Sequence, residues 1–558
     1  MLKHAAERPT APALREKEYG IWQTTPWAEL AHLVETVACG LHQAGLQRGE
    51  HLVIVGSNRP RLYATMLAAQ SLGAIPVNLY QDAAAPECVY PMTNAEVRFA
   101  VVEDQEQVDK MLEVREQYPQ LAHIFYDDPR GLRNYTEEGL GSVEELIAAG
   151  EVFAKQHPQF FREEVEKGQH GDVAAMFFTS RTTGNPKGVV HTHETLIDRA
   201  QAGAEFDRLT SAEDVLAYMP PAWIGQNIFS YAQWLVCGYV VNCPESGSTV
   251  TIDLKEIGPT YYFAPPRVFE GMLTSVMIRM EDAGSFKRGM FHTFMNVAKK
   301  VGPALMDGQS VGLVDRLKYA LGNLMVYGPL RNNLGFSRVR VAYTAGEAIG
   351  PDLFTFYRSI GVNIKQLYGS TETAVFVCLQ PDHEARADTV GVPLPAARVT
   401  VMDDDGHEVP VGTTGELWIA GPMVVPGYWA NPEATAASFT AGWWHSGDLG
   451  SVDAEGYVRV FDRKKDMLNR GGYKVYSVEV ENALMSWPGV VEAAVIGAPC
   501  PVLGERVHAV VHAPVFEVRG WRRLDPPYRR AAWALVDSDL PGELNPSAEP
   551  AKGEGRTN

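Results

Sequence analysis

The chain has 558 residues, of which 46% are hydrophobic and 21% charged, a composition that supports several hydrophobic cores in a globular protein. Its formal net charge of -19 argues against nucleic acid as a partner, since phosphate backbones need a basic surface, although a local basic site could still bind a small anion. The six cysteines are scattered without a C-x-x-C pair, which indicates reduced thiols and a cytoplasmic protein.

The termini and apolar stretches show neither a secretory signal nor a membrane span. Residues 1–4 run into a polar segment, and the longest apolar stretch, 228–241, is interrupted by Ser230, Gln233 and Gly238. We therefore expect no integral membrane protein, while a peripheral contact with a membrane and the oligomeric state stay open.

The first part of the chain alternates between helical and strand patterns. Residues 25–45 have the apolar spacing of an amphipathic helix, and 51–56 read as a strand. A helix over 61–72 and strands over 74–79 and 99–102 follow. This alternation predicts an α/β protein with parallel sheets flanked by helices.

A candidate phosphate-binding loop follows the apolar strand predicted at 174–178. Its hydroxyl- and glycine-rich sequence consists of Thr179, Ser180, Arg181, Thr182, Thr183, Gly184, Asn185, Pro186, Lys187 and Gly188. Hydroxyl groups, backbone N–H groups and one lysine can together bind phosphate. The loop is not that of P-loop NTPases, because Lys187 is followed by Gly188 and not by Ser or Thr. The alternative is a polar turn between this strand and a helix that begins near 193.

This loop resembles the phosphate loop of the adenylate-forming (AMP-binding) superfamily, which reads Thr-Ser-Gly-Ser/Thr-Thr-Gly-x-Pro-Lys-Gly. The one departure is Arg181, where the family has glycine. Arginine adds bulk and restricts positive φ, so we expect it to disturb the loop geometry.

Two segments between 215 and 331 bear on the acyl substrate. Trp223 follows a short predicted strand, at a place where relatives often have a histidine between nucleotide and acyl sites; it either lines an acyl pocket or packs as a core aromatic. The apolar spacing over residues 265–331 predicts a long helical region with methionine-rich apolar stripes. Their position resembles the insertion of long-chain fatty acyl-CoA synthetases, whose helices help to wall an acyl tunnel.

Further family motifs follow in order. Gly346-Glu347-Ala348 resembles the segment whose backbone lines the adenine, and Tyr368-Gly369-Ser370-Thr371-Glu372 matches Tyr-Gly-x-Thr-Glu. A helix N-cap would be the structural alternative for Thr371. Ser446-Gly447-Asp448 matches the motif whose aspartate holds the ribose hydroxyls. The acidic stretch 403–405 reads as a hairpin turn more readily than as a calcium site.

The resemblance implies the following site residues. For ATP or AMP they are Thr179, Ser180, Thr182, Thr183, Gly184, Lys187, Gly346, Glu347, Ala348, Gln366, Tyr368, Gly369, Thr371, Asp448 and Arg463. The catalytic group consists of Lys187, Thr371, Glu372 and Lys465, with Glu372 and Thr179 as Mg²⁺ ligands. Gly471 and Gly472 would border CoA, and Trp223 the acyl group.

The resemblance also implies a domain organisation. A large N-terminal domain of several subdomains, 1–463, would include a β-rich subdomain at about 390–462. A hinge at 464–468 would lead to a small mobile α+β C-terminal domain, 469–511, which is incomplete. Residues 512–558 diverge, by frameshift or otherwise, and we expect them to be disordered near the end.

The implied reaction is ATP-dependent activation of a carboxylic acid, favouring a medium- or long-chain fatty acid, to acyl-AMP and then acyl-CoA. One alternative is an acyl-AMP ligase that acylates a carrier protein. Another is a catalytically impaired binder of nucleotide or acyl groups, since Arg181 replaces a glycine and the family's C-terminal Ser/Thr-Gly-Lys is missing, Lys552 fitting poorly in its place.

Overall fold

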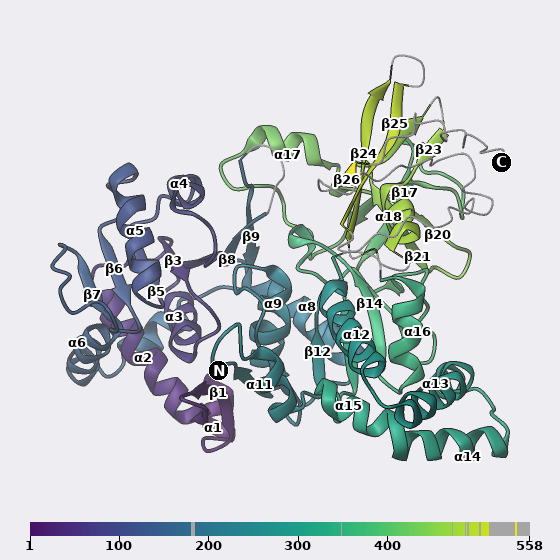
Figure 1. Cartoon of the computed structure of the whole chain (residues 1–558). Coiled ribbons are helices and arrows are strands. Elements are labelled where there is room, and N and C mark those ends of the chain that lie inside the picture. Colours follow the sequence, from purple (N-terminus) through teal and green to yellow (C-terminus); the bar gives the residue numbers. More distant parts are fainter. Residues whose placement is uncertain are drawn as a thin grey trace, which may run out of the picture. The chain divides into compact units, whose positions relative to one another are not determined.

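The computed structural model describes residues 1–179, 185–346, 349–470, 473–485, 487, 490, 492–500, 504–512 and 542–543 (Figure 1). The chain divides into two compact units. The first comprises Met1–Val399 and Ile419–Trp444, and the second Thr400–Trp418 and His445–Asn558. Part of the predicted β-rich subdomain thus belongs to the same compact unit as the C-terminal residues. The predicted boundary at 463 between the N-terminal domain and the hinge rests on the family motifs and stays a prediction.

A mainly parallel sheet with the order β7-β6-β5-β3-β4-β8-β9 forms the N-terminal part of the first unit. Its strands in this order are Leu140–Ser142, His123–Tyr126, Phe99–Val102, His51–Val55, Ile75–Leu79, Val173–Phe178 and Gly188–Thr192. The predicted strands at 51–56, 74–79, 99–102 and 174–178 are confirmed as β3, β4, β5 and β8.

Helices cover both faces of this sheet. Along β3, Leu52 and Ile54 belong to one hydrophobic core, and Val53 and Val55 to another, as the alternation of side chains in a strand requires. Helices α2, α3 and α6 contribute to the first core, and α4 and α5 to the second (Figure 1). The helices up to α8 are α1 Leu2–Glu7, α2 Trp27–Gln43, α3 Pro60–Ser71, α4 Ala85–Asn94, α5 Gln105–Gln117, α6 Val143–Gln156, α7 Phe160–Glu166 and α8 His193–Phe206.

Two further sheets complete the first unit. The four-stranded sheet has the order β10-β11-β1-β2, with strands Asp214–Leu216, Val240–Cys243, Pro12–Glu18 and Ile21–Pro26. The other has the order β12-β13-β14-β15-β16, with strands Tyr261–Phe263, Val341–Thr344, Ile364–Tyr368, Cys378–Leu379 and Val392–Pro393.

The region predicted to be helical, 265–331, consists of helices. They are α12 Pro266–Glu281, α13 Ser285–Met306, α14 Leu313–Gly322, the π-helical η2 Asn323–Tyr327 and α15 Gly328–Leu334. The apolar stripes of α12 and α13 pack with α16 (Pro351–Ser359) in one hydrophobic core, which includes Val276, Phe291 and Met295. The remaining helical segments of the first unit are α9 Ile224–Asn227, η1 Ile228–Ala232, α10 Gln233–Cys237, α11 Val250–Ile257, η3 Thr371–Thr373 and α17 Pro432–Ser438.

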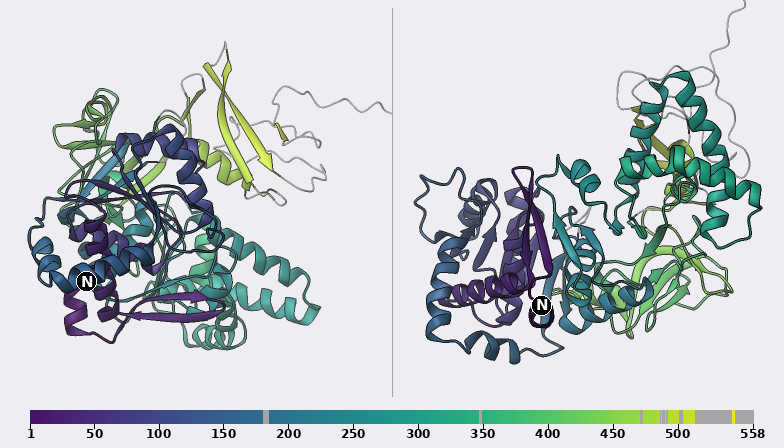
Figure 2. Two further views of the ribbon diagram at one scale, coloured as in Figure 1. Left: turned by 90° about the vertical axis from the view of Figure 1, so that its left-hand side faces the viewer. Right: turned by 90° about the horizontal axis from the view of Figure 1, so that it is seen from below.

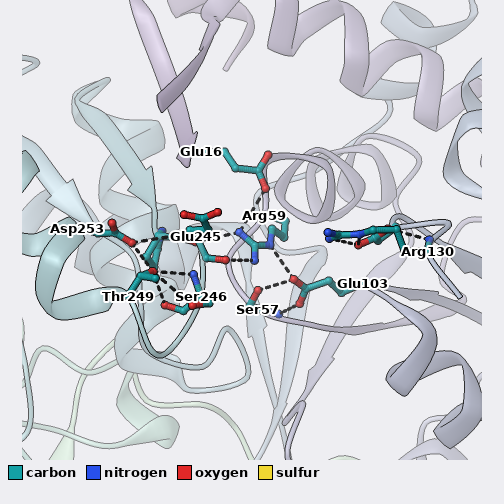
Figure 3. A network of polar contacts seen from close by, with 11 residues as sticks. Glu16, Ser57, Arg59, Glu103, Arg130, Glu245, Ser246, Thr249 and Asp253 are labelled. Carbon is teal, nitrogen blue, oxygen red and sulfur yellow. Dashed lines mark hydrogen bonds and ion pairs between the residues drawn. The ribbon is translucent and has the colours of Figure 1, made fainter. Parts of the chain in front are cut away.

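Arg59 joins the four-stranded sheet to the seven-stranded one (Figure 3). Its Nε donates to Glu103 Oε1 at 2.7 Å beyond β5, and its Nη1 lies 3.3 Å from Glu16 Oε1 on β1. The same guanidinium donates to the carbonyls of Pro244 and Glu245, both at 2.9 Å, beyond β11. A planar group with five N–H donors can hold three chain segments in this way.

The second unit contains most residues of a sheet with the order β17-β18-β20, in which β21 pairs antiparallel with β20. These strands are Arg398–Met402, Gly415–Ala420, Trp443–Val452 and Val458–Arg463; β19, Phe439–Thr440, pairs with Trp443 and Trp444 in the first unit. The C-terminal segment has α18 Ser477–Met485 and strands β22 Leu468–Arg470, β23 Tyr473–Val475, β24 Glu492–Cys500, β25 Gly504–His512 and β26 Gly542–Glu543.

The acidic turn after β17 is held by hydrogen bonds from its backbone N–H groups to one of its own carboxylates. Asp403 Oδ1 accepts hydrogen bonds from the backbone N–H groups of Asp405 and His407, each at 2.9 Å. This geometry supports the interpretation of 403–405 as a hairpin turn. Among the described helices of the chain, none is long and apolar enough to cross a membrane.

Candidate functional site

The candidate phosphate loop connects two antiparallel strands. Phe178 on β8 pairs with Gly188 on β9, Thr179 N–H donates to the Lys187 carbonyl at 3.1 Å, and Lys187 N–H donates to Thr179 Oγ1 at 3.2 Å. The alternative of a simple strand-to-helix turn is therefore wrong, because β9 intervenes before α8 begins at His193. Ser180, Arg181, Thr182, Thr183 and Gly184 lie outside the described residues.

The Lys187 side chain lies against Tyr428. Its Nζ is 4.0 Å from the centroid of the Tyr428 ring and donates to Ser438 Oγ at 3.1 Å. The Tyr428 hydroxyl donates to Glu372 Oε1 at 2.8 Å. Burial, reinforced by the Glu372 charge, raises the pKa of Tyr428, so the phenol stays protonated and can donate this bond. Tyr428 thus connects the predicted lysine with the predicted metal-binding carboxylate.

Glu372 fits a magnesium ligand by its chemistry. The residue is 8% exposed, and the Tyr428 hydroxyl donates to its Oε1. Among the hydrogen bonds of the described residues, none ends on Glu372 Oε2, so a hard oxygen remains for a divalent cation. Thr179 Oγ1, the other predicted ligand, accepts the Lys187 N–H bond and keeps a second lone pair.

The Tyr-Gly-x-Thr-Glu motif turns sharply where β14 ends. A Cβ on Gly369 would lie 1.4 Å from the Val375 carbonyl oxygen, so no other residue fits without a backbone shift. Ala374 and Val375 have φ values of 49° and 72°, in the left-handed region that β-branched residues avoid. The segment that presents Thr371 and Glu372 is therefore strained, and its backbone is held by the surrounding structure.

His191 on β9 holds the Thr371 backbone. Its Nε2 lies 2.6 Å from the Thr371 carbonyl oxygen, and its Nδ1 lies 3.3 Å from Thr195 Oγ1. Burial lowers the pKa of His191 to about 4, so the ring is neutral, with Nε2 as donor and Nδ1 as acceptor. These contacts give His191 a structural role, because they tie the phosphate-loop hairpin to the Thr371 turn.

Two polar residues of β14 are fully engaged with the protein. Gln366 Nε2 donates to the carbonyls of Ala387 at 2.9 Å and Thr389 at 3.0 Å. Lys365 Nζ lies 3.0 Å from Asp207 Oδ1 and is also paired with Asp382. The Gln366 side chain therefore positions neighbouring backbone, while its predicted contact with nucleotide stays a prediction. Neither Lys365 nor Tyr428 was identified from sequence.

The remaining predicted residues of the first unit lie as follows. Tyr368 is the last residue of β14 and is 8% exposed. Gly346 has a φ of 98°, which favours glycine; Glu347 and Ala348 lie outside the described residues. Trp223 is half-buried and stacks on Phe263, with ring centroids 5.0 Å apart. Core packing is thus shown for one face of Trp223, and pocket lining stays a prediction.

In the second unit, Asp448 and Arg463 face each other on β20 and β21. They are paired in the strand register, with Arg463 Nε 2.9 Å from Asp448 Oδ1. Asp448 is 6% exposed, and its N–H donates to Ser446 Oγ at 3.0 Å. The two residues predicted to hold the ribose are therefore brought together.

Lys465 lies in the turn after β21, where its neighbour Lys464 pairs with Asp404 at 2.9 Å and Glu416 at 3.1 Å. Lys464 therefore fixes the start of the predicted hinge within the second unit. Gly471, Gly472 and Lys552 lie outside the described residues.

Comparisons with known proteins match nearly the whole chain. Residues 1–429 match the model of a family described as AMP-binding enzyme, and 479–522 match the AMP-binding enzyme C-terminal domain, beyond the expected end of resemblance near 511. The chain is 28% identical over 549 residues to long-chain-fatty-acid–CoA ligase FadD15 of Mycobacterium bovis, covering 95% of this chain and 84% of that protein.

A second relative and a solved structure extend the comparison. Indoleacetate–CoA ligase of Aromatoleum aromaticum is 27% identical over 533 residues, covering 94% of this chain and 88% of that protein. The crystal structure of the anthranilate CoA ligase AuaEII with anthranoyl-AMP superposes with a TM-score of 0.71 at 22% identity, covering 91% of this chain and 85% of the other. The predicted fold class, a large N-terminal and a small C-terminal part of mixed α/β structure, is confirmed.

Proposed function

The chain belongs to the AMP-binding enzyme family, and on this premise we propose that it is an AMP-forming acyl-CoA synthetase. A carboxylate oxygen of the substrate attacks the α-phosphorus of ATP, the bond to the β-phosphate oxygen breaks, and pyrophosphate leaves. The CoA thiol then loses its proton to solvent and attacks the acyl carbon, the acyl–phosphate anhydride bond breaks, and AMP leaves. No protein nucleophile is needed, so the protein positions groups and stabilises charge.

The observation that carries this proposal is the contact between Lys187, Tyr428 and Glu372. It joins the phosphate loop and the Tyr-Gly-x-Thr-Glu turn, which lie far apart in sequence, through one aromatic ring. In the proposed roles, the Lys187 ammonium stabilises phosphate charge and the Thr371 hydroxyl hydrogen-bonds the α-phosphate. A Mg²⁺ held by Glu372 and Thr179 would supply further charge neutralisation of the phosphates.

Asp448 and Arg463 would bind the ribose, Lys465 would act at the hinge, and Gly471 and Gly472 would border the CoA. These assignments rest on the family motifs, and for the first pair on the 2.9 Å ion pair as well.

For the substrate we favour a medium- or long-chain fatty acid. Support comes from the relative named as a long-chain-fatty-acid–CoA ligase, which matches most of both chains. The methionine-rich stripes give less support than the sequence suggested, because α12 and α13 use them to pack against α16. Relatives named for indoleacetate and ferulate make an aromatic acid the alternative substrate class.

The test is mass spectrometry of products from ATP, Mg²⁺, CoA and a graded series of fatty and aromatic acids. Acyl-CoA from the native chain supports the synthetase and identifies the substrate. Acyl-AMP that is passed only to an acyl carrier protein supports the ligase alternative. ATP binding without pyrophosphate release supports the impaired binder, and Arg181→Gly then tests whether the loop arginine is the cause.

Two variants test the contact itself. Lys187→Met should lower the rate of acyl-AMP formation by about 100-fold or more, since a charge next to the reacting phosphate is lost. Tyr428→Phe should lower it by about tenfold, the value of one hydrogen bond to a charged group. Lys155→Met, at a 79% exposed lysine of α6, is the matched control and should leave the rate unchanged. Equal rates for Tyr428→Phe and the native chain would remove Tyr428 from the site.

A further inference from the structure

Helix α14 and the π-helical turn η2 expose large apolar side chains over their whole length. Six of them are between 46% and 79% exposed: Leu313, Val314, Leu317, Leu321, Leu324 and Met325, here called the α14 face. Isolated exposed leucines are common, but a continuous apolar strip of this kind usually marks an interaction site. Figures 1 and 2 show α14 beside α13 in the first unit.

The α14 face follows the helical period. Residues 313, 317, 321 and 324 are spaced by three or four positions, which places them on one side of a helix. The other side packs inward: Gly322, Val326 and Tyr327 are buried, and the Tyr319 hydroxyl donates to the Ser359 carbonyl at 2.9 Å. The apolar side is therefore the more exposed side of α14 and η2.

Basic residues border the α14 face on both edges. At about 100° per residue, Lys318 falls about 40° beyond Val314 on one edge, and Arg316 falls about 60° beyond Leu313 on the other. Both side chains are exposed. Long basic side chains at the edges of an apolar helix face can extend to lipid headgroups while their stems stay in apolar contact.

An open groove of about 690 Å³ adjoins the Arg316 edge of α14. It is lined by Arg316, Tyr319, Asn323, Arg331 and Ser337, with apolar residues between them, and none of its lining residues is acidic. Arg331 is held in place, since its Nη2 donates to Asn323 Oδ1 at 2.9 Å and it also donates to the Ile360 carbonyl. Two guanidinium groups in a chain of net charge -19 make this groove a local site for an anionic phosphate.

We propose that the α14 face and this basic groove dock the protein on an anionic phospholipid membrane, with the leucines in the acyl boundary and the lipid phosphates at Arg316 and Arg331. Helix α14 has ten residues, far fewer than the roughly 20 needed to span a bilayer, so it lies in the interface. Charge selects the partner: the acidic chain as a whole is repelled by anionic lipid, and only a local basic site reverses this. The inference does not depend on the proposed activity.

The test is co-sedimentation of the full chain with vesicles of phosphatidylcholine alone and of equal parts phosphatidylcholine and phosphatidylglycerol. The native chain should bind the phosphatidylglycerol vesicles more tightly, and less so at high salt. Leu317→Glu with Leu321→Glu should weaken binding to them by at least about tenfold, because two apolar side chains leave the lipid. Arg316→Gln with Lys318→Gln should weaken it by about fivefold for each charge, and change phosphatidylcholine binding little.

The matched control is Val152→Glu, which places the same charge at a 57% exposed apolar residue of α6 and should bind vesicles like the native chain. Thermal melting verifies that each variant is folded. Equal binding to both vesicle types, no binding to either, or undiminished binding of the double leucine variant overturns the proposal. Light scattering without vesicles gives a further contrary outcome: a native dimer that Leu317→Glu with Leu321→Glu converts to a monomer would assign the face to a second copy of the chain.

Discussion

Strand β14 and helix α14 belong to the same compact unit, but β14 buries polar side chains whereas α14 exposes apolar ones. On β14, Lys365 is 0% exposed and Gln366 4% exposed, and both are fully paired with protein groups. On α14, Leu317 is 71% exposed and contacts solvent. A buried polar group must find its partner inside the protein, whereas an exposed apolar strip finds none there. The first feature marks a rigid support for the candidate site, and the second marks contact with something outside.

The largest effect is expected at Lys365. Lys365→Met removes the cation that pairs with Asp207 and Asp382 and leaves the buried Asp207 carboxylate uncompensated, which costs about 3–5 kcal/mol of unfolding free energy. Burial already raises the pKa of Asp207, and Lys365 opposes that shift. Chemical denaturation measures the loss. The control, Lys300→Met, breaks the exposed pair with Asp315 and should cost less than about 1 kcal/mol. Similar losses for both variants would contradict the distinction between buried and exposed polar groups.

The next effect concerns the end of β14. Gly369→Ala forces a Cβ to within 1.4 Å of the Val375 carbonyl unless the backbone moves, so we expect a loss of about 1–3 kcal/mol in stability. Acyl-AMP formation should also fall by tenfold or more, because Thr371 shifts with the turn. Gly271→Ala is the control: this exposed glycine of α12 has open space around its Cβ position, and alanine there should stabilise the helix slightly. Unchanged activity of Gly369→Ala would show that the turn does not position Thr371.

Glu16 is intermediate in burial between Lys365 and Leu317. Its side chain is 31% exposed, and its partner is Arg59 (Figure 3). Burial raises the pKa of Glu16 to about 7, with Asp127, Glu18 and Glu103 adding to it and Arg59 opposing it. The folded chain therefore binds more protons than the unfolded chain between about pH 4.5 and 7, and this group lowers stability as the pH rises through that window.

Glu16→Gln removes this dependence. From pH 5 to pH 8, the melting temperature of the variant should rise relative to the native chain, by the equivalent of about 2 kcal/mol. Scanning calorimetry at several pH values measures the difference, with Glu113→Gln at an exposed glutamate of α5 as control. A constant difference across this range would show that Glu16 ionises alike in both states.

Periodicity and motif order were enough to predict the elements that repeat locally. Strands β3, β4, β5 and β8 and helices α2 and α3 were predicted within a few residues, because each has a continuous apolar run or a clear helical period. Strand β9 was missed, since a short segment after Pro-Lys-Gly gains its strand character only by pairing with β8.

The partners of site residues could not be predicted in the same way. Asp207 is 158 residues from Lys365, and Glu372 is 56 residues from Tyr428, so nothing in either local sequence indicates the contact. From sequence alone, a lysine within an apolar strand predicts an exposed strand edge. Only the folded sheet shows that a carboxylate lies beside it. Motif order identified the residues on each side of the candidate site, and the connection through Tyr428 required the fold.

The smallest effect is expected on α14, and it completes the comparison. Leu317→Gln should change the free energy of unfolding by no more than about 0.5 kcal/mol, because the side chain is 71% exposed and leaves no cavity. The same substitution at Leu353, 6% exposed on α16, removes a leucine from a core and should cost about 2–5 kcal/mol. Chemical denaturation of both variants measures the contrast. If Leu317→Gln lowered the free energy of unfolding as much as Leu353→Gln, the α14 face would be packed against part of this chain. That result would contradict a membrane as its partner. A Leu317 that contributes nothing to folding leaves the α14 face available to an external partner, as the proposal requires.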